Sequence, residues 1–325
     1  MKAIVITKYG KPVDVLRVKE VAKPIPGDNQ VLVKVYAASL NVADLAPIRG
    51  AFIARLLGTG WLRPKRKILG TDIAGQVEAV GKSVTQFRPG DEVFGAAAGG
   101  LAEYACVAED RLTLKPANVT FATAAAVPVA GVSAVQGLRK GRIEPGQHVL
   151  IHGASGGVGT FAVQLAKSFG AEVTAVCSTR NVDNAHSLGA DHVIDYTQID
   201  FTKKGKTYDL ILAVNGDRSP LDYRKALSPK GICVVLGGSI AQIFQAMLFG
   251  PLVSKAGGQR IGLMGIAKMN QKDLNFLKEL LAAGKVKPSI DRRYPFSKTV
   301  EAVEYLAEGH ARAKIVITME SDSKT

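Results

Sequence analysis

The chain has 325 residues, of which 47% are hydrophobic and 22% are charged, as in an ordinary globular protein. This length exceeds what one hydrophobic core usually organises, so we expect more than one domain. The formal net charge of +14 at pH 7 predicts attraction to anions. The basic residues are dispersed apart from one dense run at 63–67, and no RNA-binding motif accompanies them, so we expect no nucleic-acid partner.

The cysteines and the apolar segments bear on location. Cys106, Cys177 and Cys233 are odd in number and lack C-x-x-C spacing, which argues against a disulfide framework and a cysteine zinc site. The first residues read as a strand and not as a secretory signal, and the apolar window 240–253 is shorter than the ~20 residues of a spanning helix. We expect a cytoplasmic protein without a transmembrane segment; its charge leaves weak peripheral binding to membranes open.

Residues 1–121 contain short β-branched runs between glycines and prolines, for example 30–36 and 73–80. This pattern predicts an antiparallel, barrel-like β domain. From 122 to 266 strands alternate with helices, which is typical of a parallel sheet with crossover helices. Its six expected strands are 148–152, 172–177, 193–195, 210–214, 232–236 and 261–264. In 267–325 we expect a helix at 271–283 and a last strand at 314–318 that returns to the first domain.

The segment from Gly153 to Gly159 is rich in glycine, follows an apolar strand and opens a helix. In that context glycines let the backbone approach a pyrophosphate, whose charge the helix amides stabilise. The sequence therefore predicts a dinucleotide site of the Rossmann type. Its predicted contacts in this loop are Ser155, Gly156, Gly157, Val158 and Gly159.

The end of the second strand of this unit predicts which dinucleotide binds. An NAD-specific site usually has a carboxylate there for the ribose hydroxyl. Here Cys177 is followed by Ser178, Thr179, Arg180 and Asn181, so a hydroxyl and a guanidinium are available for a 2′-phosphate. We predict that Ser178, Arg180 and Asn181 contact the cofactor and that NADPH is preferred to NADH. Asp183 weakens this preference in one interpretation.

Further segments occur in the order found in one protein family. They are Ser39 to Asp44, Gly70 to Gly75 with Val80 and Gly81, Gly90 to Val93, Ala102 to Tyr104, Ala126 to Pro128, the glycine loop, Gly189 to Tyr196, and Lys314 to Val316. On these segments the chain resembles the zinc-free quinone oxidoreductase branch of the medium-chain dehydrogenase/reductase superfamily, the branch of zeta-crystallin. Through 177–181, 187–191 and 308–314 it is also similar to plant chloroplast-envelope quinone oxidoreductase homologues.

The resemblance implies an α/β fold in which a Rossmann doubly wound parallel sheet is inserted in a GroES-like β-barrel catalytic domain. It also implies a homodimer joined through the Rossmann sheets, with the strand at Ile261 as the candidate edge. Tyr196 matches a cofactor contact of relatives. Asn215, Gly237 and Gly238 are expected at strand ends that face the cofactor, and Lys314 is expected to approach it from the last strand, although ordinary strand-end chemistry is an alternative for all of them.

Zinc-dependent relatives hold their metal with a cysteine and a histidine, and this chain has Asn41 and Thr71 at the matching positions. We therefore predict no metal. Hydride transfer then needs an acceptor that is already electrophilic, such as a quinone or an α,β-unsaturated carbonyl. Asn41 is the predicted donor to the developing oxyanion. Asp44 either orients Asn41, sits in the cleft or is a turn residue. The proton donor stays open because Ala46 and Phe52 stand where relatives carry tyrosines.

Two apolar segments, 51–62 and 240–253, lead to the hypothesis of a lipophilic quinone or enone, with core packing as the alternative. Two other functions remain open. One is an enoyl-thioester reductase that binds an acyl-CoA or a carrier phosphate through the basic run 63–67. The other is a non-catalytic NADPH-binding protein that associates with membranes or RNA through its positive charge.

Overall fold

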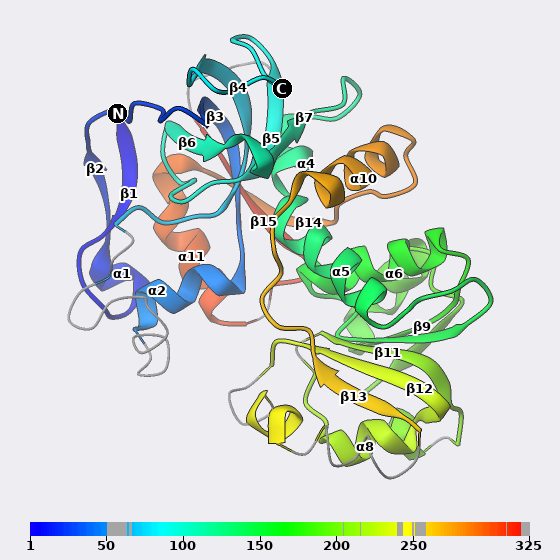
Figure 1. Cartoon of the computed structure of the whole chain (residues 1–325). Helices are drawn as coiled ribbons and strands as arrows, with labels where there is room; N and C mark the ends of the chain where they lie inside the picture. Colours follow the sequence, from blue (N-terminus) through cyan, green and yellow to red (C-terminus); the bar gives the residue numbers. More distant parts are fainter. Residues whose placement is uncertain are drawn as a thin grey trace. The chain divides into compact units, whose positions relative to one another are not determined.

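The computed structural model describes residues 1–50, 64, 67–203, 205–214, 216–238, 243–248, 250, 258–309 and 311–319 (Figure 1). Asn215, the apolar segment 51–62, most of the basic run 63–67 and much of 240–253 lie outside the described residues. The chain forms two compact units. Unit 1 comprises residues 1–129, 269–284 and 288–325, and unit 2 comprises 130–268 and 285–287.

Unit 1 is a β structure built from both ends of the chain. Its strands are β1 (Lys2–Ile6), β2 (Leu16–Glu20), β3 (Gln30–Leu40), β4 (Asp72–Val80), β5 (Glu92–Ala96), β6 (Tyr104–Ala108), β7 (Leu112–Leu114), β14 (Ile290–Pro295) and β15 (Lys314–Thr318). The main sheet has the order β14-β15-β3-β4-β5-β7, with β6 also paired to β3, while β1 and β2 pair separately. Its helices are α1 (Pro12–Val15), α2 (Ala46–Arg49), α4 (Phe121–Ala125), α10 (Gln271–Ala282) and α11 (Thr299–Ala307).

The last strand, β15, returns to unit 1 as the sequence predicts. It pairs antiparallel with β3, with Ile315 opposite Leu40 and Thr318 opposite Ala37. Its apolar residues are buried in the core of this unit with those of β3 and β4. Because α4 packs on β3 and β4, the chain leaves unit 1 at Val129, whereas the sequence places this boundary after residue 121.

Unit 2 contains a six-stranded parallel sheet in the order β10-β9-β8-β11-β12-β13. The strands are β8 (His148–His152), β9 (Glu172–Cys177), β10 (His192–Asp195), β11 (Tyr208–Val214), β12 (Leu227–Leu236) and β13 (Arg260–Leu263). The helices include α5 (Pro128–Lys140), which begins in unit 1, and α6 (Gly157–Ser168), α7 (Val182–Ser187) and α8 (Pro220–Lys225). Strand interiors such as Val149 to Ile151 are fully buried, as expected for a parallel sheet covered on both faces.

The strand order reverses beside β8. From β8 the chain adds β9 and β10 on one side and then returns to place β11, β12 and β13 on the other. In open parallel sheets ligands bind outside the carboxyl ends of the strands at such a reversal. This confirms the expected α/β class, with a Rossmann sheet inserted in a second, β-rich unit. Among the residues that the structure describes, no helix is long and apolar enough to cross a membrane.

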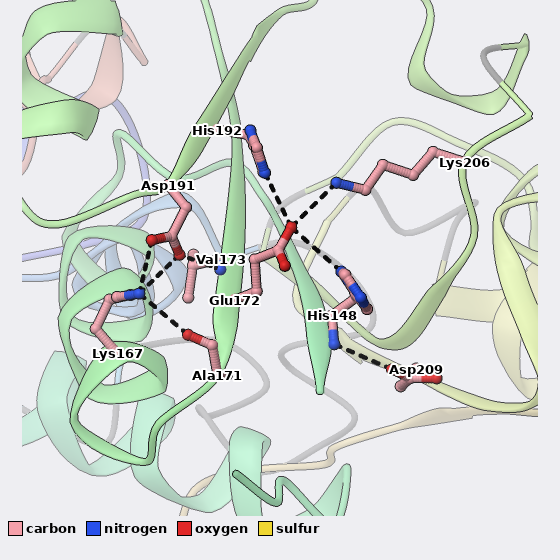
Figure 2. Close-up of polar contacts among 9 residues, drawn as sticks. All are labelled: His148, Lys167, Ala171, Glu172, Val173, Asp191, His192, Lys206 and Asp209. Atoms are coloured by element: carbon pink, nitrogen blue, oxygen red, sulfur yellow. Dashed lines mark hydrogen bonds and ion pairs between the residues drawn. The ribbon is translucent and has the colours of Figure 1, made fainter. Parts of the chain in front are cut away.

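The opposite, amino end of this sheet carries a surface cluster of charges (Figure 2). Glu172 Oε1 lies 2.9 Å from His192 Nε2 and 3.3 Å from both His148 Nδ1 and Lys206 Nζ. His148, Glu172 and His192 are the first residues of β8, β9 and β10, and they come together because these strands are neighbours. The cluster is solvent-exposed and lies at the end of the strands away from the glycine loop.

Candidate functional site

The glycine loop joins the carboxyl end of β8 to α6, and its shape requires glycine. Gly153 has φ +83°, and a Cβ there would lie 2.0 Å from the carbonyl oxygen of Val214 on the neighbouring strand. A Cβ on Gly159 would lie 2.1 Å from the carbonyl oxygen of Gly153. The loop therefore folds tightly against β11 and places the first turn of α6, at Gly157 and Val158, beside the end of β8. The first amides of a helix lack partners within the helix and bind anions.

The other predicted cofactor residues of unit 2 share one position in the sheet, directly after the carboxyl end of a strand. Ser178, Arg180 and Asn181 follow β9, Tyr196 follows β10, and Gly237 and Gly238 follow β12. Because the strands are parallel, these ends meet at the edge that carries the glycine loop. Tyr196 is 52% exposed and Arg180 is exposed, so both are accessible to a ligand.

Asn181 has a supporting position in the turn after β9. It is 5% exposed, and its Nδ2 donates to Ser178 Oγ at 2.9 Å. Its backbone N–H donates to the Ser178 carbonyl at 2.8 Å. Asn181 thus fixes the turn that presents Ser178, and the accessible polar groups here are the Ser178 hydroxyl and the Arg180 guanidinium.

Asp195 is a residue of this edge that the sequence did not single out. It ends β10 directly opposite Cys177, and its carboxylate accepts a hydrogen bond from Thr179 Oγ1 at 2.6 Å. This hydrogen bond and those from Thr197 and Gln198 lower the pKa of Asp195. A carboxylate therefore does lie beside the turn that carries Arg180, supplied by the neighbouring strand. Only the pairing of β9 with β10 reveals it.

His152 and Tyr223 form a buried pair under the loop after β11. His152 Nδ1 lies 2.9 Å from Tyr223 Oη, and a Cβ on Gly216 would lie 2.0 Å from that oxygen. Burial lowers the pKa of His152 to about 4, with Asp217 acting in the opposite direction. The imidazole is therefore neutral near pH 7. The pair was not predicted, because no local signal joins residues 71 positions apart.

In unit 1, Asn41 and Asp44 lie in the turn that follows β3. Asp44 is 3% exposed; its Oδ2 accepts from the Asn41 backbone N–H at 2.8 Å and its Oδ1 from Thr71 Oγ1 at 3.1 Å. Burial raises the pKa of Asp44 to about 6, against the hydrogen bond from Asn41. Asp44 thus holds the backbone of the turn, whereas other residues hold the Asn41 side chain.

The Asn41 side chain belongs to a buried charged network with Asp72 and Lys314. Asn41 Nδ2 donates to Asp72 Oδ2 at 2.9 Å, and Lys314 Nζ donates to Asn41 Oδ1 at 2.5 Å and to Asp72 Oδ2 at 3.0 Å. The Asp72 and Lys314 side chains are 0% and 3% exposed. Ser39 Oγ and the Val129 backbone N–H also donate to Asp72, at 3.0 and 2.9 Å. Such a paired and hydrogen-bonded charge is the form in which ions are tolerated in a core.

The family resemblance of the sequence implies that Asn41 and Thr71 replace the metal ligands of zinc-dependent relatives. Within the described ranges no group of three or more His, Cys, Asp or Glu is arranged to hold a metal ion. The cation that contacts Asn41 and Asp72 is instead the Lys314 ammonium. A dication beside this ammonium would be repelled.

The parallel sheet with its order reversal and glycine loop defines a dinucleotide-binding protein, and unit 1 adds a β-rich domain closed by the C-terminal strand. Residues 27–117 match the family model "Alcohol dehydrogenase GroES-like domain", and residues 188–317 match "Zinc-binding dehydrogenase".

Individual proteins match over almost the whole chain. The "2-methylene-furan-3-one reductase" of Solanum lycopersicum is 37% identical over 98% of this chain and 79% of its own length. The "Chloroplast envelope quinone oxidoreductase homolog" of Arabidopsis thaliana is 36% identical over 98% of both. A solved quinone oxidoreductase from Coxiella burnetii superposes with a TM-score of 0.86 at 31% identity, over 98% of this chain and 99% of that one. The chain belongs to the medium-chain dehydrogenase/reductase superfamily, in its quinone oxidoreductase branch.

Proposed function

We propose that this protein uses NADPH to reduce quinones or α,β-unsaturated carbonyls by direct hydride transfer, without zinc. The observation that carries the proposal is the neutral Asn41 amide, held by a lysine and an aspartate in the segment where zinc relatives carry a metal ligand. A hydrogen-bond donor of this kind suits an acceptor that is electrophilic without a Lewis acid. The names of the Solanum lycopersicum and Arabidopsis thaliana relatives, a 2-methylene-furan-3-one reductase and a quinone oxidoreductase homolog, support the same substrate class.

The residues of unit 2 have separate roles in holding the cofactor, which supplies the hydride when bound. The amides at the start of α6 bind the pyrophosphate. Ser178 and Arg180 bind the 2′-phosphate through charge-assisted hydrogen bonds. The Asp195 carboxylate lies beside the turn that carries Arg180, so its negative charge limits the preference for NADPH over NADH. Tyr196, Asn215, Gly237 and Gly238 complete the site in the proposal.

In unit 1 the second N–H of the Asn41 amide donates to the acceptor oxygen on which negative charge develops. Stabilising that charge lowers the barrier to hydride transfer because the donor is fixed before the reaction starts. Asp44 keeps the turn in place through the Asn41 backbone. The proton that completes the reduction comes from solvent in this proposal, since the sequence offers no tyrosine at the family position.

The test mixes chelator-treated protein with NADPH or NADH and each of four acceptors: 1,2-naphthoquinone, 9,10-phenanthrenequinone, a long-chain enone and crotonyl-CoA. We expect NADPH-selective oxidation with a quinone or the enone, a large loss in Asn41→Ala, and a smaller NADPH preference in Arg180→Gln. Turnover of crotonyl-CoA alone would instead identify an enoyl-thioester reductase. Activity that needs added zinc contradicts the proposal, as does salt-sensitive binding to anionic liposomes or RNA with no turnover.

The proposed acceptor is lipophilic, and the protein is proposed to be a homodimer. Phe244, Met247 and Leu248 are 46%, 52% and 58% exposed, which supports an apolar contact on unit 2.

Strand β13 ends the sheet order, so one side of it is a candidate for pairing with a second copy. Light scattering would give the mass in solution, and cell fractionation would test the predicted cytoplasmic location.

A further inference from the structure

The amide of Asn41 is held at both of its polar atoms by ions of opposite charge. Its oxygen accepts from the Lys314 ammonium at 2.5 Å, and its nitrogen donates to the Asp72 carboxylate at 2.9 Å. The two ions are themselves 3.0 Å apart. The three groups therefore form a closed triangle in which every contact is between a donor and an acceptor.

This triangle permits only one orientation of the amide. A 180° flip would place the amide NH₂ against the ammonium, which has donors only, and the amide oxygen against the carboxylate, which has acceptors only. Both contacts would be repulsive in a buried site where charges are weakly screened. The charges of Lys314 and Asp72 thus fix the orientation of the Asn41 amide, with its oxygen towards the ammonium and its nitrogen towards the carboxylate.

The fixed orientation leaves one donor of Asn41 available. A side-chain amide has two N–H groups, and Asp72 accepts one of them. The other N–H has no partner among the residues whose positions are described, and the Asn41 side chain is partly exposed. The ammonium on the amide oxygen also polarises the group, which strengthens the remaining N–H as a donor.

The Lys314 ammonium, in contrast, has no donor left. Its three N–H groups match three acceptors: the Leu40 carbonyl oxygen at 3.0 Å, Asn41 Oδ1 and Asp72 Oδ2. Its side chain is 3% exposed. This arrangement does not support the sequence-based expectation that Lys314 contacts the cofactor, because a phosphate would have to displace one of these partners.

We infer that Lys314 is a positioning residue for acceptor reduction: fixed by Asp72, it orients and polarises the Asn41 amide so that one N–H is aimed at the acceptor oxygen. This inference rests on the proposed function, in which Asn41 donates to that oxygen. It assigns the lysine of the last strand to the acceptor and not to NADPH.

The experiment compares Asn41→Ala, the charge-neutral double variant Asp72→Asn with Lys314→Met, and the triple variant that combines all three changes. The double variant avoids leaving either buried charge without a partner. We expect its kcat for the acceptor to fall about 10-fold or more, towards that of Asn41→Ala, because a misoriented amide loses much of the effect of a fixed oxyanion donor. The dissociation constant of NADPH, followed by nicotinamide fluorescence, should stay within about twofold of the parent, and the triple variant should lose nothing beyond Asn41→Ala.

Lys115 offers a matched control in the same unit. Its side chain is 5% exposed, pairs with Glu92 and donates to the Pro116 and Val119 carbonyls, away from Asn41. Lys115→Met should lower thermal stability and leave kcat and the NADPH affinity unchanged. A comparable loss of kcat in this variant would show that removal of any buried lysine in unit 1 lowers kcat, which contradicts the inference.

Other outcomes separate the inference from the function on which it rests. A weaker affinity for NADPH with unchanged kcat in the double variant would make Lys314 a cofactor contact and overturn the inference. Full activity in the double variant, with a loss in Asn41→Ala, would overturn the inference alone. Full activity in Asn41→Ala would overturn both the donor role of Asn41 and the positioning role of Lys314.

Discussion

The two units build their candidate sites from different materials. In unit 2 the site consists of backbone amides, glycines and strand-end side chains, over a neutral pair of His152 and Tyr223. In unit 1 it consists of a few side chains around a buried ion pair. A site for a large phosphate ligand needs accessible amides, whereas a site that presents one donor needs that donor fixed in advance. The four predictions below test this contrast, beginning with the change that is expected to weaken ligand binding most.

Gly159→Ala should strongly weaken NADPH binding. Its Cβ would lie 2.1 Å from the Gly153 carbonyl oxygen and 2.8 Å from backbone atoms of Ala154, so the loop must move. Since the amides bind only in their present arrangement, we expect affinity to fall about 100-fold or more, equivalent to roughly 2.7 kcal/mol. Fluorescence titration with NADPH measures it. Gly262→Ala is the control, because a Cβ there meets nothing within 4 Å. Equal affinity in the two variants would contradict the requirement for glycine.

Asp72→Ala should be the most destabilising change in unit 1. It leaves the Lys314 ammonium buried without its counter-charge and removes the acceptor of Ser39 Oγ and of the Val129 N–H. Breaking a buried pair in this way costs about 3–5 kcal/mol of unfolding free energy. Denaturant unfolding measures the loss.

Two comparisons sharpen this prediction. Adding Lys314→Met to Asp72→Ala should restore part of the loss, because the unpaired charge is then gone. Asp191→Ala removes a pair with Lys167, 2.7 Å apart, whose side chains are 36% and 35% exposed, and should cost only about 1 kcal/mol or less. A similar loss of unfolding free energy in Asp72→Ala and Asp191→Ala would show that burial does not increase the contribution of the Asp72 pair to stability.

The two units should respond to acid in opposite directions. Asp44 has a raised pKa of about 6, so its protonation favours the folded state: its contribution is full below about pH 4 and is lost as pH rises through about 6. His152 has a lowered pKa of about 4, so its contribution is full above about pH 6.5 and is lost as pH falls through about 4. Each effect is roughly 3 kcal/mol by the size of the shift.

Hydrogen exchange followed by mass spectrometry between pH 4 and 8 separates the units, once rates are corrected for the intrinsic effect of pH. Asp44→Asn should flatten the pH dependence of protection in unit 1 alone, and His152→Gln should do so in unit 2 alone. A pH dependence that survives in both variants would show that other groups dominate it.

The smallest effect is expected from Glu172→Gln in the cluster of Figure 2. Its partners His148, His192 and Lys206 are all at least 40% exposed, so solvent and salt screen these contacts. The cluster also lies at the amino ends of the strands, away from the glycine loop. NADPH affinity should be unchanged and thermal stability nearly so. A clear loss of cofactor binding would mean that the two ends of the sheet are coupled.

Local signals predicted much of the fold. The expected strands 148–152, 172–177 and 314–318 have the bounds of β8, β9 and β15, because each is an apolar run between turns. The glycine loop was predictable because the glycines, the strand and the helix are consecutive. For Asp44 the sequence left a turn residue as one alternative, and its carboxylate accepts a hydrogen bond from the Asn41 backbone N–H in the turn after β3.

The contacts that the sequence did not predict join distant residues. The Asp72 and Lys314 side chains meet across 242 positions, because β15 and β4 flank β3 on either side. Neither residue carries a local sign of burial, and lysine is usually exposed. Asp195 likewise became relevant only through the pairing of β10 with β9. These contacts depend on which strands pair with each other, and a single sequence does not show that pairing.

The place of β15 in the chain also has a consequence for biosynthesis. A ribosome makes the chain from its amino end, and domains generally fold as units during synthesis. All six strands of unit 2 are made before residue 264, whereas β3 waits for its antiparallel neighbour β15 until residues 314–318 emerge. The inserted unit can therefore mature on the nascent chain while residues 37–40 of β3 still lack their β15 neighbour; residues 30–34 already pair with β6. Lys314, the residue that completes the network around Asn41, is made only after all six strands of unit 2.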